Sequence, residues 1–492
     1  MRRSSSTTGS RPGNASRRTM DNHNGTEEPT LMEIAGIMGG SLHVPSPALR
    51  RSRITGVCSD TRRIEAGNLF VAIAGERFDG HDFVPDAMRA GACASLVTDD
   101  WHARRADREA PDAARIVVPA VIPALQAFAG WHRRRFDLPV VAVTGSSGKT
   151  TTKNMIAAVL GERYRVFKTP GNLNSQLGVA EALFTLHGDH GAAVLELGMN
   201  HAGELDRLSR MTRPSIGVIT NVGPAHIEFF ESIEGIARAK GEILDHLPEG
   251  GSAVLNADDL LVMKQAGRSL ARVVTFGRSA GADVRLARVR TELSGSAFTL
   301  SDGASFRVNL MGEHQVMNAA AAVAVGRLSG IADQAIARAL RSVEPTPMRM
   351  EYRKAGAVHL INDAYNANPS SMKAALDALA TAEGRKLVVL GDMLELGDLG
   401  RAAHRDIGRR AAEVAERIIT VGELAREIAV AAVDGGIPAS RVVSCSCNDE
   451  AAAAVLAEVE DGDVVLVKGS RGMRMETVVE YLEKSIGQGE MG

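Results

Sequence analysis

Residues 140–153 read Val-Val-Ala-Val-Thr-Gly-Ser-Ser-Gly-Lys-Thr-Thr-Thr-Lys, an apolar run that ends in a glycine-rich turn. The apolar run predicts a buried strand, and the residues after Gly148 predict a helix. In such a unit the N–H groups of the turn and the positive end of the helix form a site for a phosphate group. Lys149 can reach the outer phosphates, and Thr150 can offer its hydroxyl to Mg²⁺. The stretch therefore predicts an α/β domain that binds a nucleotide.

The turn is shorter than the common form of this motif. The pattern G-x-x-x-x-G-K-[ST] has a glycine where this chain has Val143, so the spacing here is G-x-x-G-K-T. An ordinary strand-to-helix turn with an incidental lysine is the alternative, but the strand before the turn and the helix after it favour phosphate binding. The loop residues expected to contact ATP are Gly145, Ser146, Ser147, Gly148, Lys149, Thr150 and Thr151.

The composition indicates several domains and no strongly charged surface. The chain has 492 residues, 45% of them hydrophobic, and single cores stop growing at about 250–300 residues, so we expect three domains. The 57 basic and 59 acidic residues give a net charge of -2, which excludes a global field that would recruit nucleic acid or an anionic membrane. We therefore expect small-molecule substrates and no nucleic acid or membrane partner. We also expect a monomer.

Neither the cysteines nor the N-terminus indicates export. The four cysteines form no C-x-x-C pair, which argues against zinc and structural disulfides and favours a reducing compartment, by default the cytoplasm. Residues 1–29 are rich in Ser, Arg, Thr, Asn and Gly and lack an apolar core, so we interpret them as a disordered tail. A targeting role for the arginines of this tail is the alternative. No later segment reaches the length of a membrane span.

Strand-like and helix-length segments alternate along the rest of the chain, which predicts parallel sheets with helices on both faces. We assign residues 30–138 to a small N-terminal α/β domain, 139–345 to a central ATP-binding domain and 346–492 to a C-terminal Rossmann-like domain. The last boundary rests on Pro345 and Pro347, which follow a long alanine-rich helix. Strands are predicted at 68–73, 94–98, 138–143, 192–197, 215–220, 252–256, 358–362, 386–390, 417–421 and 463–468.

Polar residues beyond the predicted strands of the central domain are candidates for the rest of the site. Glu196 ends a buried strand, at the edge where open α/β sheets bind ligands and where Mg²⁺ needs oxygen ligands, although a surface acid is the alternative. His226 also follows a strand, but a lone loop histidine is more often solvated or hydrogen-bonded. Lys240, in the helical stretch 233–247, has on its own the pattern of a solvated helix lysine.

Three asparagines of the central domain leave their roles open. Asn172 and Asn174 suit a turn, and their side chains suit a sugar or a phosphate equally well. Asn318 lies inside an alanine-rich helix that asparagine does not favour, which hints at a ligand contact.

The first polar segment of the C-terminal domain, residues 361–372, reads Ile-Asn-Asp-Ala-Tyr-Asn-Ala-Asn-Pro-Ser-Ser-Met. Turn and capping chemistry explains part of it, with Ser370 as the expected helix cap and Pro369 as the residue that stops the strand. That chemistry does not require three polar side chains together, those of Asp363, Asn366 and Asn368.

A second polar segment, residues 468–476, reads Lys-Gly-Ser-Arg-Gly-Met-Arg-Met-Glu after a predicted buried strand. Glycines and the cations Lys468 and Arg471 in this position suit a carboxylate or a phosphate, and they suit an ordinary helix start equally well.

Taken in order, these motifs resemble those of the Mur ligase family. The resemblance covers the chain from about residue 31 to its end. The runs at 363–369 and 468–471 are similar to those of the branch that adds a dipeptide. The matching stretches are Ser-Asp-Thr-Arg at 59–62, the phosphate loop at 144–153, Gly-Asn-Leu-Asn at 171–174, Glu-Leu-Gly-Met-Asn at 196–200, Asn-Val-Gly-Pro-Ala-His at 221–226, Asp-Ala-Tyr-Asn-Ala-Asn-Pro at 363–369 and Lys-Gly-Ser-Arg at 468–471.

The resemblance implies a role for each candidate residue. The UDP-linked substrate would contact Ser59, Asp60, Thr61, Arg62, Asn172 and Asn174. Beyond the loop, ATP would contact Asn318, Arg349 and Asp363, and Mg²⁺, expected as two ions, would be held by Thr150, Glu196, His226 and Lys240. Lys240 is the position expected to be carbamylated, which turns a cation into a carboxylate-like ligand. The incoming dipeptide would contact Asn366, Asn368, Lys468 and Arg471.

By the same resemblance, the expected reaction is ATP-dependent formation of a C–N bond between UDP-N-acetylmuramoyl-tripeptide and D-alanyl-D-alanine, a step in cell wall synthesis. The catalytic residues would be Lys149, Glu196, His226 and Lys240. A family member that adds diaminopimelate or lysine, or a folylpolyglutamate synthase, is the first alternative, and neither has the run at 363–369 as it stands here. A catalytically silent nucleotide-binding protein is the alternative from another class.

Overall fold

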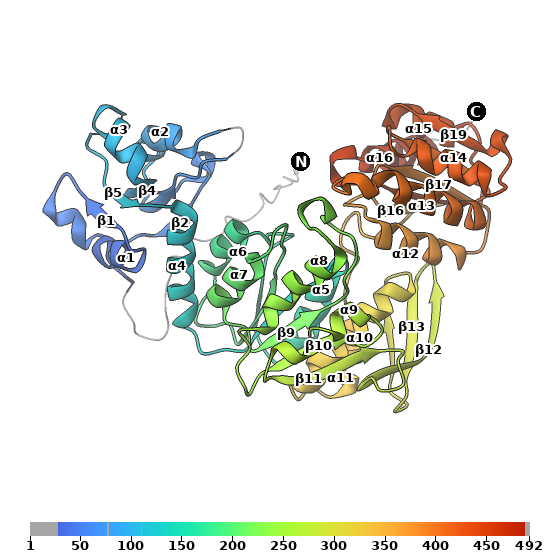
Figure 1. Ribbon diagram of the computed structural model, residues 1–492, viewed down its shortest axis with the longest axis horizontal. Helices are drawn as coiled ribbons and strands as arrows, with labels where there is room; N and C mark the ends of the chain where they lie inside the picture. The colour runs from blue at the N-terminus through green and yellow to red at the C-terminus, as the bar shows by residue number, and fades with distance from the viewer. Residues whose placement is uncertain (1–27, 76–77, 110, 488–492) are drawn as a thin grey trace, which may run out of the picture. The chain divides into compact units, whose positions relative to one another are not determined.

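The computed structural model describes residues 28–75, 78–109 and 111–487, so most of the predicted N-terminal tail, residues 1–27, lies outside the described residues. These residues form three β-sheets with helices, an α/β architecture that can be followed in Figure 1. One unit comprises the chain up to residue 132 together with 184–189, and the other comprises 133–183 and 190 onward.

The first unit contains a five-stranded sheet in the order β1-β5-β4-β3-β2. Strands β2 to β5 are parallel, as the alternation of strands and helices predicted, and β1 pairs antiparallel with β5 at one edge. The strands are β1 (Ser41–His43), β2 (Gly56–Cys58), β3 (Asn68–Val71), β4 (Ala94–Thr98) and β5 (Arg115–Val118). The helices are α1 (Leu31–Ile37), α2 (Val84–Arg89), α3 (Asp99–Glu109) and α4 (Val121–Arg134).

The second unit begins with a nine-stranded sheet in the order β14-β13-β12-β11-β10-β9-β6-β8-β7. The strands from β7 to β12 are parallel, which agrees with the predicted strand–helix repeat. Their bounds are β6 (Val140–Thr144), β7 (Val166–Lys168), β8 (Ala192–Glu196), β9 (Ile216–Ile219), β10 (Ser252–Asn256), β11 (Arg272–Gly277) and β12 (Val284–Glu292). The helices are α5 (Lys149–Gly161), α6 (Gln176–Leu183), α7 (Glu204–Thr212), α8 (Ile233–Gly241), α9 (Leu260–Met263), α10 (Glu313–Leu328) and α11 (Asp333–Arg341).

An antiparallel extension of this sheet was not predicted. Strands β12, β13 (Gly295–Leu300) and β14 (Ser305–Val308) form a meander beyond β11 (Figure 1). Leu286 and Phe298 face the core while Arg290 and Arg307 face solvent, which is the alternation of a sheet with one solvated face. The predicted parallel central sheet therefore continues at this edge into an antiparallel part.

Helix α10 packs against the phosphate-loop helix α5 in the core of this sheet. Four consecutive alanines of α10, Ala319–Ala322, have no exposed surface, and their small side chains let the two helices approach closely. Val159 and Ile156 of α5 belong to the same cluster. The position of α5, and with it the start of the helix at Lys149, is thus determined by core packing on its far side.

The last sheet has six strands in the order β15-β16-β20-β17-β18-β19, all parallel except the edge strand β15. The strands are β15 (Glu351–Ala355), β16 (Val358–Asp363), β17 (Lys386–Gly391), β18 (Arg417–Val421), β19 (Val442–Cys445) and β20 (Val464–Lys468). The helices are α12 (Pro369–Ala380), α13 (Gly400–Val414), α14 (Arg426–Asp434), α15 (Asn448–Leu456) and α16 (Glu476–Gly487).

The start of α12 corrects the expected role of Ser370. Asn368 is the N-cap, because its side chain accepts the N–H of Ser371 at 2.9 Å while the Ser371 hydroxyl accepts the N–H of Asn368 at 3.0 Å. Pro369 is the first residue of the helix rather than the residue that stops the strand. Both groups satisfied by this reciprocal cap would otherwise be left without partners at the helix start.

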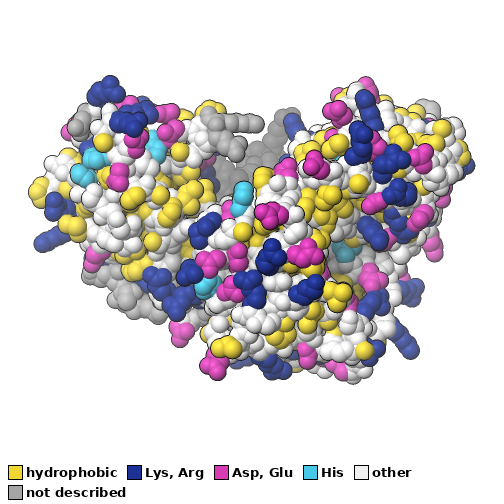
Figure 2. Space-filling view, in the orientation of Figure 1, with side chains coloured by type: hydrophobic (Ala, Val, Ile, Leu, Met, Phe, Trp, Pro, Cys, Tyr) yellow, Lys and Arg dark blue, Asp and Glu magenta, His cyan; other side chains and the backbone are white. Residues whose placement is uncertain are grey.

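The surface carries charges of both signs. Figure 2 shows Lys and Arg side chains interspersed with Asp and Glu over the visible face, which agrees with the near balance of 57 basic and 59 acidic residues. In the part of the chain that the structure describes, no helix combines the length and the apolar character needed to cross a bilayer.

Candidate nucleotide and metal site

The loop between β6 and α5 has a backbone that only glycine adopts easily. Gly145 has φ +153° and Gly148 has φ +78°. A Cβ on Gly145 would lie 1.8 Å from Oγ1 of Thr220, and a Cβ on Gly148 would lie 2.4 Å from Oδ1 of Asn318. The predicted glycines are therefore required both by backbone conformation and by the close approach of two neighbouring elements.

The loop is held by the residues that follow β9. The N–H of Ser147 donates to Oδ1 of Asn221 at 2.9 Å, and the hydroxyl of Ser146 donates to the carbonyl of Gly223 at 2.9 Å. The Thr220 hydroxyl donates to the carbonyl of Ser147 at 2.7 Å. The first N–H groups of α5 have no acceptor within the helix. The loop is thus preformed, with helix N–H groups left to receive an anion.

The pKa values of two lysines near the loop are lowered. Lys149 donates to the carbonyl of Gly145 at 2.7 Å, and burial lowers its pKa although nearby Glu196 opposes the shift. Lys240 on α8 is 2% exposed, and burial together with the charge of Lys149 lowers its pKa well below the usual range. The two ammonium groups disfavour each other in a buried site, so each would be stabilised by negative charge brought close to it.

Two predicted metal ligands each have a buried oxygen atom that makes no hydrogen bond in the described residues. Oγ1 of Thr150 and Oε2 of Glu196 are buried, and neither has a hydrogen-bond partner among the described residues. Oε1 of Glu196 accepts a hydrogen bond from the side chain of Asn174 at 2.8 Å, and Oε2 lies 3.4 Å from Nζ of Lys153. Hydroxyl and carboxylate oxygens are the ligands that Mg²⁺ prefers, and these two make no hydrogen bond in the part of the chain that the structure describes, so Thr150 and Glu196 fit Mg²⁺ with Lys153 already beside Oε2.

No group of three or more His, Cys, Asp or Glu side chains in the described residues forms a ready metal cage. Mg²⁺ is usually bound by one or two carboxylates together with phosphate and water oxygens. The metal-binding hypothesis therefore depends on nucleotide phosphates as further ligands.

His226 has a partner that sequence reasoning missed. It lies in the left-handed region (φ +60°) at the start of a short 3₁₀ turn, and its Nδ1 is 2.5 Å from Oε2 of Glu395 in the loop after β17. Burial lowers the pKa of His226, while Glu395 opposes that shift. Glu395 also has a left-handed backbone (φ +62°), so both residues hold an uncommon conformation at this contact.

Two more predicted ATP contacts are brought to the loop. Asn318 of α10 is 6% exposed, packs beside Gly148, and donates to Oε1 of Gln315 at 3.0 Å, which explains a polar residue inside this alanine-rich helix. Arg349 stacks on the ring of Tyr365 at 3.9 Å, and its charge contributes to the lowered pKa of Lys149.

Residues of the C-terminal polar segments mostly bind one another. Lys468 is 2% exposed and donates to Oδ2 of Asp363 at 2.6 Å and to the carbonyl of Asn366 at 2.9 Å. The other oxygen of Asp363 accepts the N–H of Met350 at 2.9 Å. Arg471, by contrast, is half-exposed and pairs with Glu476 at 2.9 Å. Lys468 therefore anchors the 363–366 segment, while Arg471 faces solvent.

Four of the six residues predicted to contact the UDP-linked substrate, Ser59 to Arg62, lie in the first unit. Asp60 caps the 3₁₀ turn Thr61–Arg63, and its two oxygens accept hydrogen bonds from the Arg62 side chain at 2.9 and 2.8 Å. These bonds and the backbone N–H of Arg62 lower the pKa of Asp60 to about 2. In the second unit, Asn172 is exposed and Asn174 is tied to Glu196.

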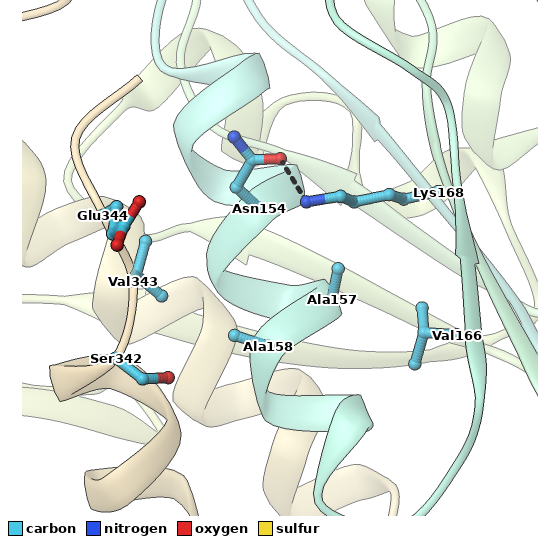
Figure 3. Close-up of a pocket in the computed structure, with 8 residues that line it drawn as sticks. All are labelled: Asn154, Ala157, Ala158, Val166, Lys168, Ser342, Val343 and Glu344. Atoms are coloured by element: carbon cyan, nitrogen blue, oxygen red, sulfur yellow. Dashed lines mark hydrogen bonds between the residues drawn. The ribbon is translucent and has the colours of Figure 1, made fainter. Parts of the chain in front are cut away.

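A separate hollow of about 380 Å³ lies beside α5 (Figure 3). Within it Lys168 donates to Asn154 at 3.4 Å, and Asn154 donates to the hydroxyl of Thr346 at 3.1 Å. The lining residues are Asn154, Ala157, Ala158, Val166, Lys168, Ser342, Val343 and Glu344. No predicted site residue is among them, so the hollow is distinct from the phosphate loop.

Comparison with protein families assigns all three parts of the chain. Residues 53–134 match the "Mur ligase family, catalytic domain", residues 143–326 the "Mur ligase middle domain" and residues 348–471 the "Mur ligase, glutamate ligase domain". A Bacillus subtilis (strain 168) protein, UDP-N-acetylmuramoyl-tripeptide–D-alanyl-D-alanine ligase, is 39% identical over 465 residues, which are 93% of this chain and 98% of that protein. The chain belongs to the Mur ligase family.

Solved structures give the same three-domain Mur ligase architecture. A crystal structure of MurF from Acinetobacter baumannii matches with a TM-score of 0.84 and 32% identity, covering 93% of this chain and 99% of that one. MurF ligase from Thermotoga maritima in complex with ADP matches with a TM-score of 0.79 and 30% identity, covering 88% of this chain and 98% of that one. The predicted family and the predicted α/β architecture of this Mur ligase are therefore confirmed.

Proposed function

We propose that this Mur ligase uses ATP to join D-alanyl-D-alanine to UDP-N-acetylmuramoyl-tripeptide, forming the UDP-muramoyl pentapeptide of peptidoglycan synthesis. The observation that carries the proposal is the 39% identity, over 98% of its length, to a ligase with this activity. The phosphate loop, with the preformed geometry described above, supports the use of ATP, as does the ADP complex of the Thermotoga maritima relative.

The chemistry follows from the difficulty of joining a carboxylate to an amine in water. A carboxylate oxygen of the tripeptide attacks the γ-phosphorus of ATP, ADP leaves, and the acid becomes an acyl phosphate. The amine of the dipeptide then attacks the acyl carbon, phosphate leaves with the bonding electrons, and the amine loses a proton. Lys149 and the first N–H groups of α5 offset the repulsion between the two anions of the first step.

Mg²⁺ would be held by Thr150, Glu196, His226 and a carbamylated Lys240, and when bound it supplies positive charge beside the transferred phosphoryl group. Lys240 supports this role by its burial, because its ammonium has no acidic partner in the described part of the chain and a buried lone cation is costly. Carbamylation replaces that cation with an anion. Mass spectrometry of the intact protein under carbon dioxide tests it: an adduct that disappears in Lys240→Met supports the proposal, and no adduct in the parent chain contradicts it.

The substrates would be divided among the three parts. Ser59 to Arg62 would receive the uridine end in residues 30–138, with Asn172 and Asn174 contacting the same substrate from residues 139–345. Asn366, Asn368, Lys468 and Arg471 would serve the dipeptide in residues 346–492. Water competes for an acyl phosphate, so the C-terminal part would close during turnover to exclude it. We further propose a monomer that acts in the cytoplasm on small molecules, with no nucleic acid or membrane partner.

Phosphate release tests the proposed reaction. The purified chain is incubated with ATP, UDP-N-acetylmuramoyl-tripeptide and D-alanyl-D-alanine, and then with each component omitted. Release that requires both partners supports the proposal. Release with diaminopimelate, lysine or glutamate in place of the dipeptide would assign the chain to another branch of acid–amino-acid ligases, and binding of ATP without any release would indicate a silent nucleotide-binding protein.

A further inference from the structure

We infer that Lys153 is a positioning residue that ties the phosphate-loop helix to Glu196 and to the loop at 169–174, so that metal binding and binding of the UDP-linked substrate depend on one buried side chain. The inference rests on the proposed roles of Glu196 and of the two loop asparagines. It concerns a residue to which neither the motifs nor the proposed reaction gave a role.

Lys153 lies one helical turn beyond Lys149 on α5 and is 1% exposed. Its Nζ donates to the carbonyl of Thr169 at 2.9 Å and to the carbonyl of Gly171 at 2.5 Å. The same atom lies 3.4 Å from Oε2 of Glu196. An ammonium group has three donors, and here three acceptors from two different segments surround it.

The two segments are joined to each other as well as to Lys153. The N–H of Glu196 donates to the Thr169 hydroxyl at 3.0 Å, and Asn174 donates to Oε1 of Glu196 at 2.8 Å. The carbonyl of Asn174 accepts the N–H of Gly198 at 2.8 Å. Each oxygen of Glu196 therefore faces a nitrogen from a different element: Asn174 faces Oε1 and Lys153 faces Oε2.

The loop that Lys153 holds is otherwise exposed. Residues 170–173 face solvent, whereas Thr169 is fully buried beneath them. Gly171 has φ +51°, and no atom lies within 4 Å of the position its Cβ would take, so little packing stabilises the turn from outside. The two carbonyl bonds from Lys153 thus tie the buried side of the segment that carries Asn172 to α5, in addition to the bond from the N–H of Leu173 to the carbonyl of Pro170 within the turn.

Burial of a charge at this position argues against a role in stability alone. An apolar side chain of similar length would fill the same space without the cost of removing an ammonium group from water. The charge instead balances Glu196 and aims its Oε2, the oxygen that lacks a hydrogen-bond partner among the described residues. Partners that orient a metal ligand in this way change metal affinity by about 10- to 100-fold when they are removed.

The test compares the full-length chain with Lys153→Met and with a matched control, Lys168→Met. Lys168 precedes Thr169 and is an exposed lysine that donates to Asn154. In the described part of the chain no hydrogen bond or ion pair joins it to Glu196, so its removal takes a charge from β7 without removing a contact of Glu196. Three quantities are measured: Mn²⁺ affinity in the presence of ADP by electron paramagnetic resonance, affinity for UDP-N-acetylmuramoyl-tripeptide by calorimetry, and KM for each substrate.

For Lys153→Met we expect Mn²⁺ affinity to fall by about tenfold or more, affinity for the UDP-linked tripeptide to fall with it, and KM for the dipeptide to stay unchanged. Lys168→Met should match the parent chain. A Lys153→Met protein with a lower melting temperature but unchanged affinities would overturn the inference, because Lys153 would then act only in stability.

Two further variants keep the outcome clear. Lys153→Gln can still donate to the two carbonyls but carries no charge, and it replaces Lys153→Met if that variant does not fold. Failure of both variants to fold also overturns the inference. Glu196→Gln separates the inference from the proposed function. If Glu196→Gln lowers Mn²⁺ affinity and the Lys153 variants do not, only the inference fails; if Glu196→Gln has no effect, the proposed metal role of Glu196 fails.

Discussion

The ammonium group of Lys468 lies 2.6 Å from Oδ2 of Asp363, and this ion pair joins the ends of β20 and β16 where both side chains are largely buried. Lys468→Met would leave Asp363 as an unpaired buried carboxylate. Removal of one partner of a buried ion pair lowers the free energy of unfolding by about 3–5 kcal/mol. We expect a loss near the lower figure, because Asp363 still accepts a hydrogen bond from the N–H of Met350. Chemical denaturation at neutral pH measures it, with the exposed Lys373→Met as the control. Equal stability of the two variants would contradict the prediction.

Gly148→Ala should weaken nucleotide binding. The left-handed backbone at this position and the 2.4 Å approach of a Cβ to Asn318 mean that alanine must displace the loop, the helix α10 side chain, or both. We expect the affinity for ADP, measured by calorimetry, to fall by at least about tenfold, a free-energy loss of about 1.4 kcal/mol. Gly161→Ala is the matched control, because it lies at the end of the same helix with open space around its Cβ. ADP affinity in Gly148→Ala equal to that of the control would show that the loop does not need glycine here.

Lys149→Ala should abolish turnover while the fold stays intact. Lys149 begins α5, and in the described residues its side chain makes one hydrogen bond, to the carbonyl of Gly145. The buried carboxylate of Glu196 keeps Lys153 as a cation at 3.4 Å when Lys149 is removed, so the fold should tolerate the change. Removal of one preorganised charge at the reacting group typically costs about 100- to 1,000-fold in kcat. Steady-state phosphate release gives kcat, and circular dichroism and the melting temperature report the fold. Activity within a few-fold of the parent chain would refute the role of Lys149 at the phosphates.

Much of the fold could be predicted because its strands are buried on both faces. The strands at 94–98, 252–256 and 417–421 have the predicted bounds, since continuous apolar runs between polar turns mark such strands clearly. The meander β12–β14 was missed because its solvated face carries charged residues such as Arg290, which interrupt the apolar pattern. An alternation of period two was the signal that could have revealed it.

The site could be predicted in its local parts and not in its long-range partners. The strand, the glycines and Lys149 are contiguous, so a single motif identifies them. Glu395 meets His226 across 169 positions of sequence, and Lys153 meets Gly171 only because α5 packs against the end of β7. Such contacts depend on how the helices and strands pack, so they cannot be predicted from the spacing of residues along the chain.

The pH dependence of stability should report His404, which is fully buried on α13. The N–H of Met393 donates to its Nε2 at 2.9 Å, so Nδ1 carries the proton and donates to the carbonyl of Gly400 at 2.6 Å. Burial lowers the pKa of His404, so below about pH 6.5 the unfolded chain takes up a proton that the folded chain refuses. The contribution of His404 to stability is therefore complete above about pH 6.5 and is lost as the pH falls toward the lowered pKa.

His404→Gln cannot titrate, and its free energy of unfolding should fall less steeply between pH 7.5 and 5.5 than that of the parent chain, as measured by urea denaturation. Equal slopes for the two proteins would mean that His404 takes up its proton in the folded state as readily as in the unfolded one.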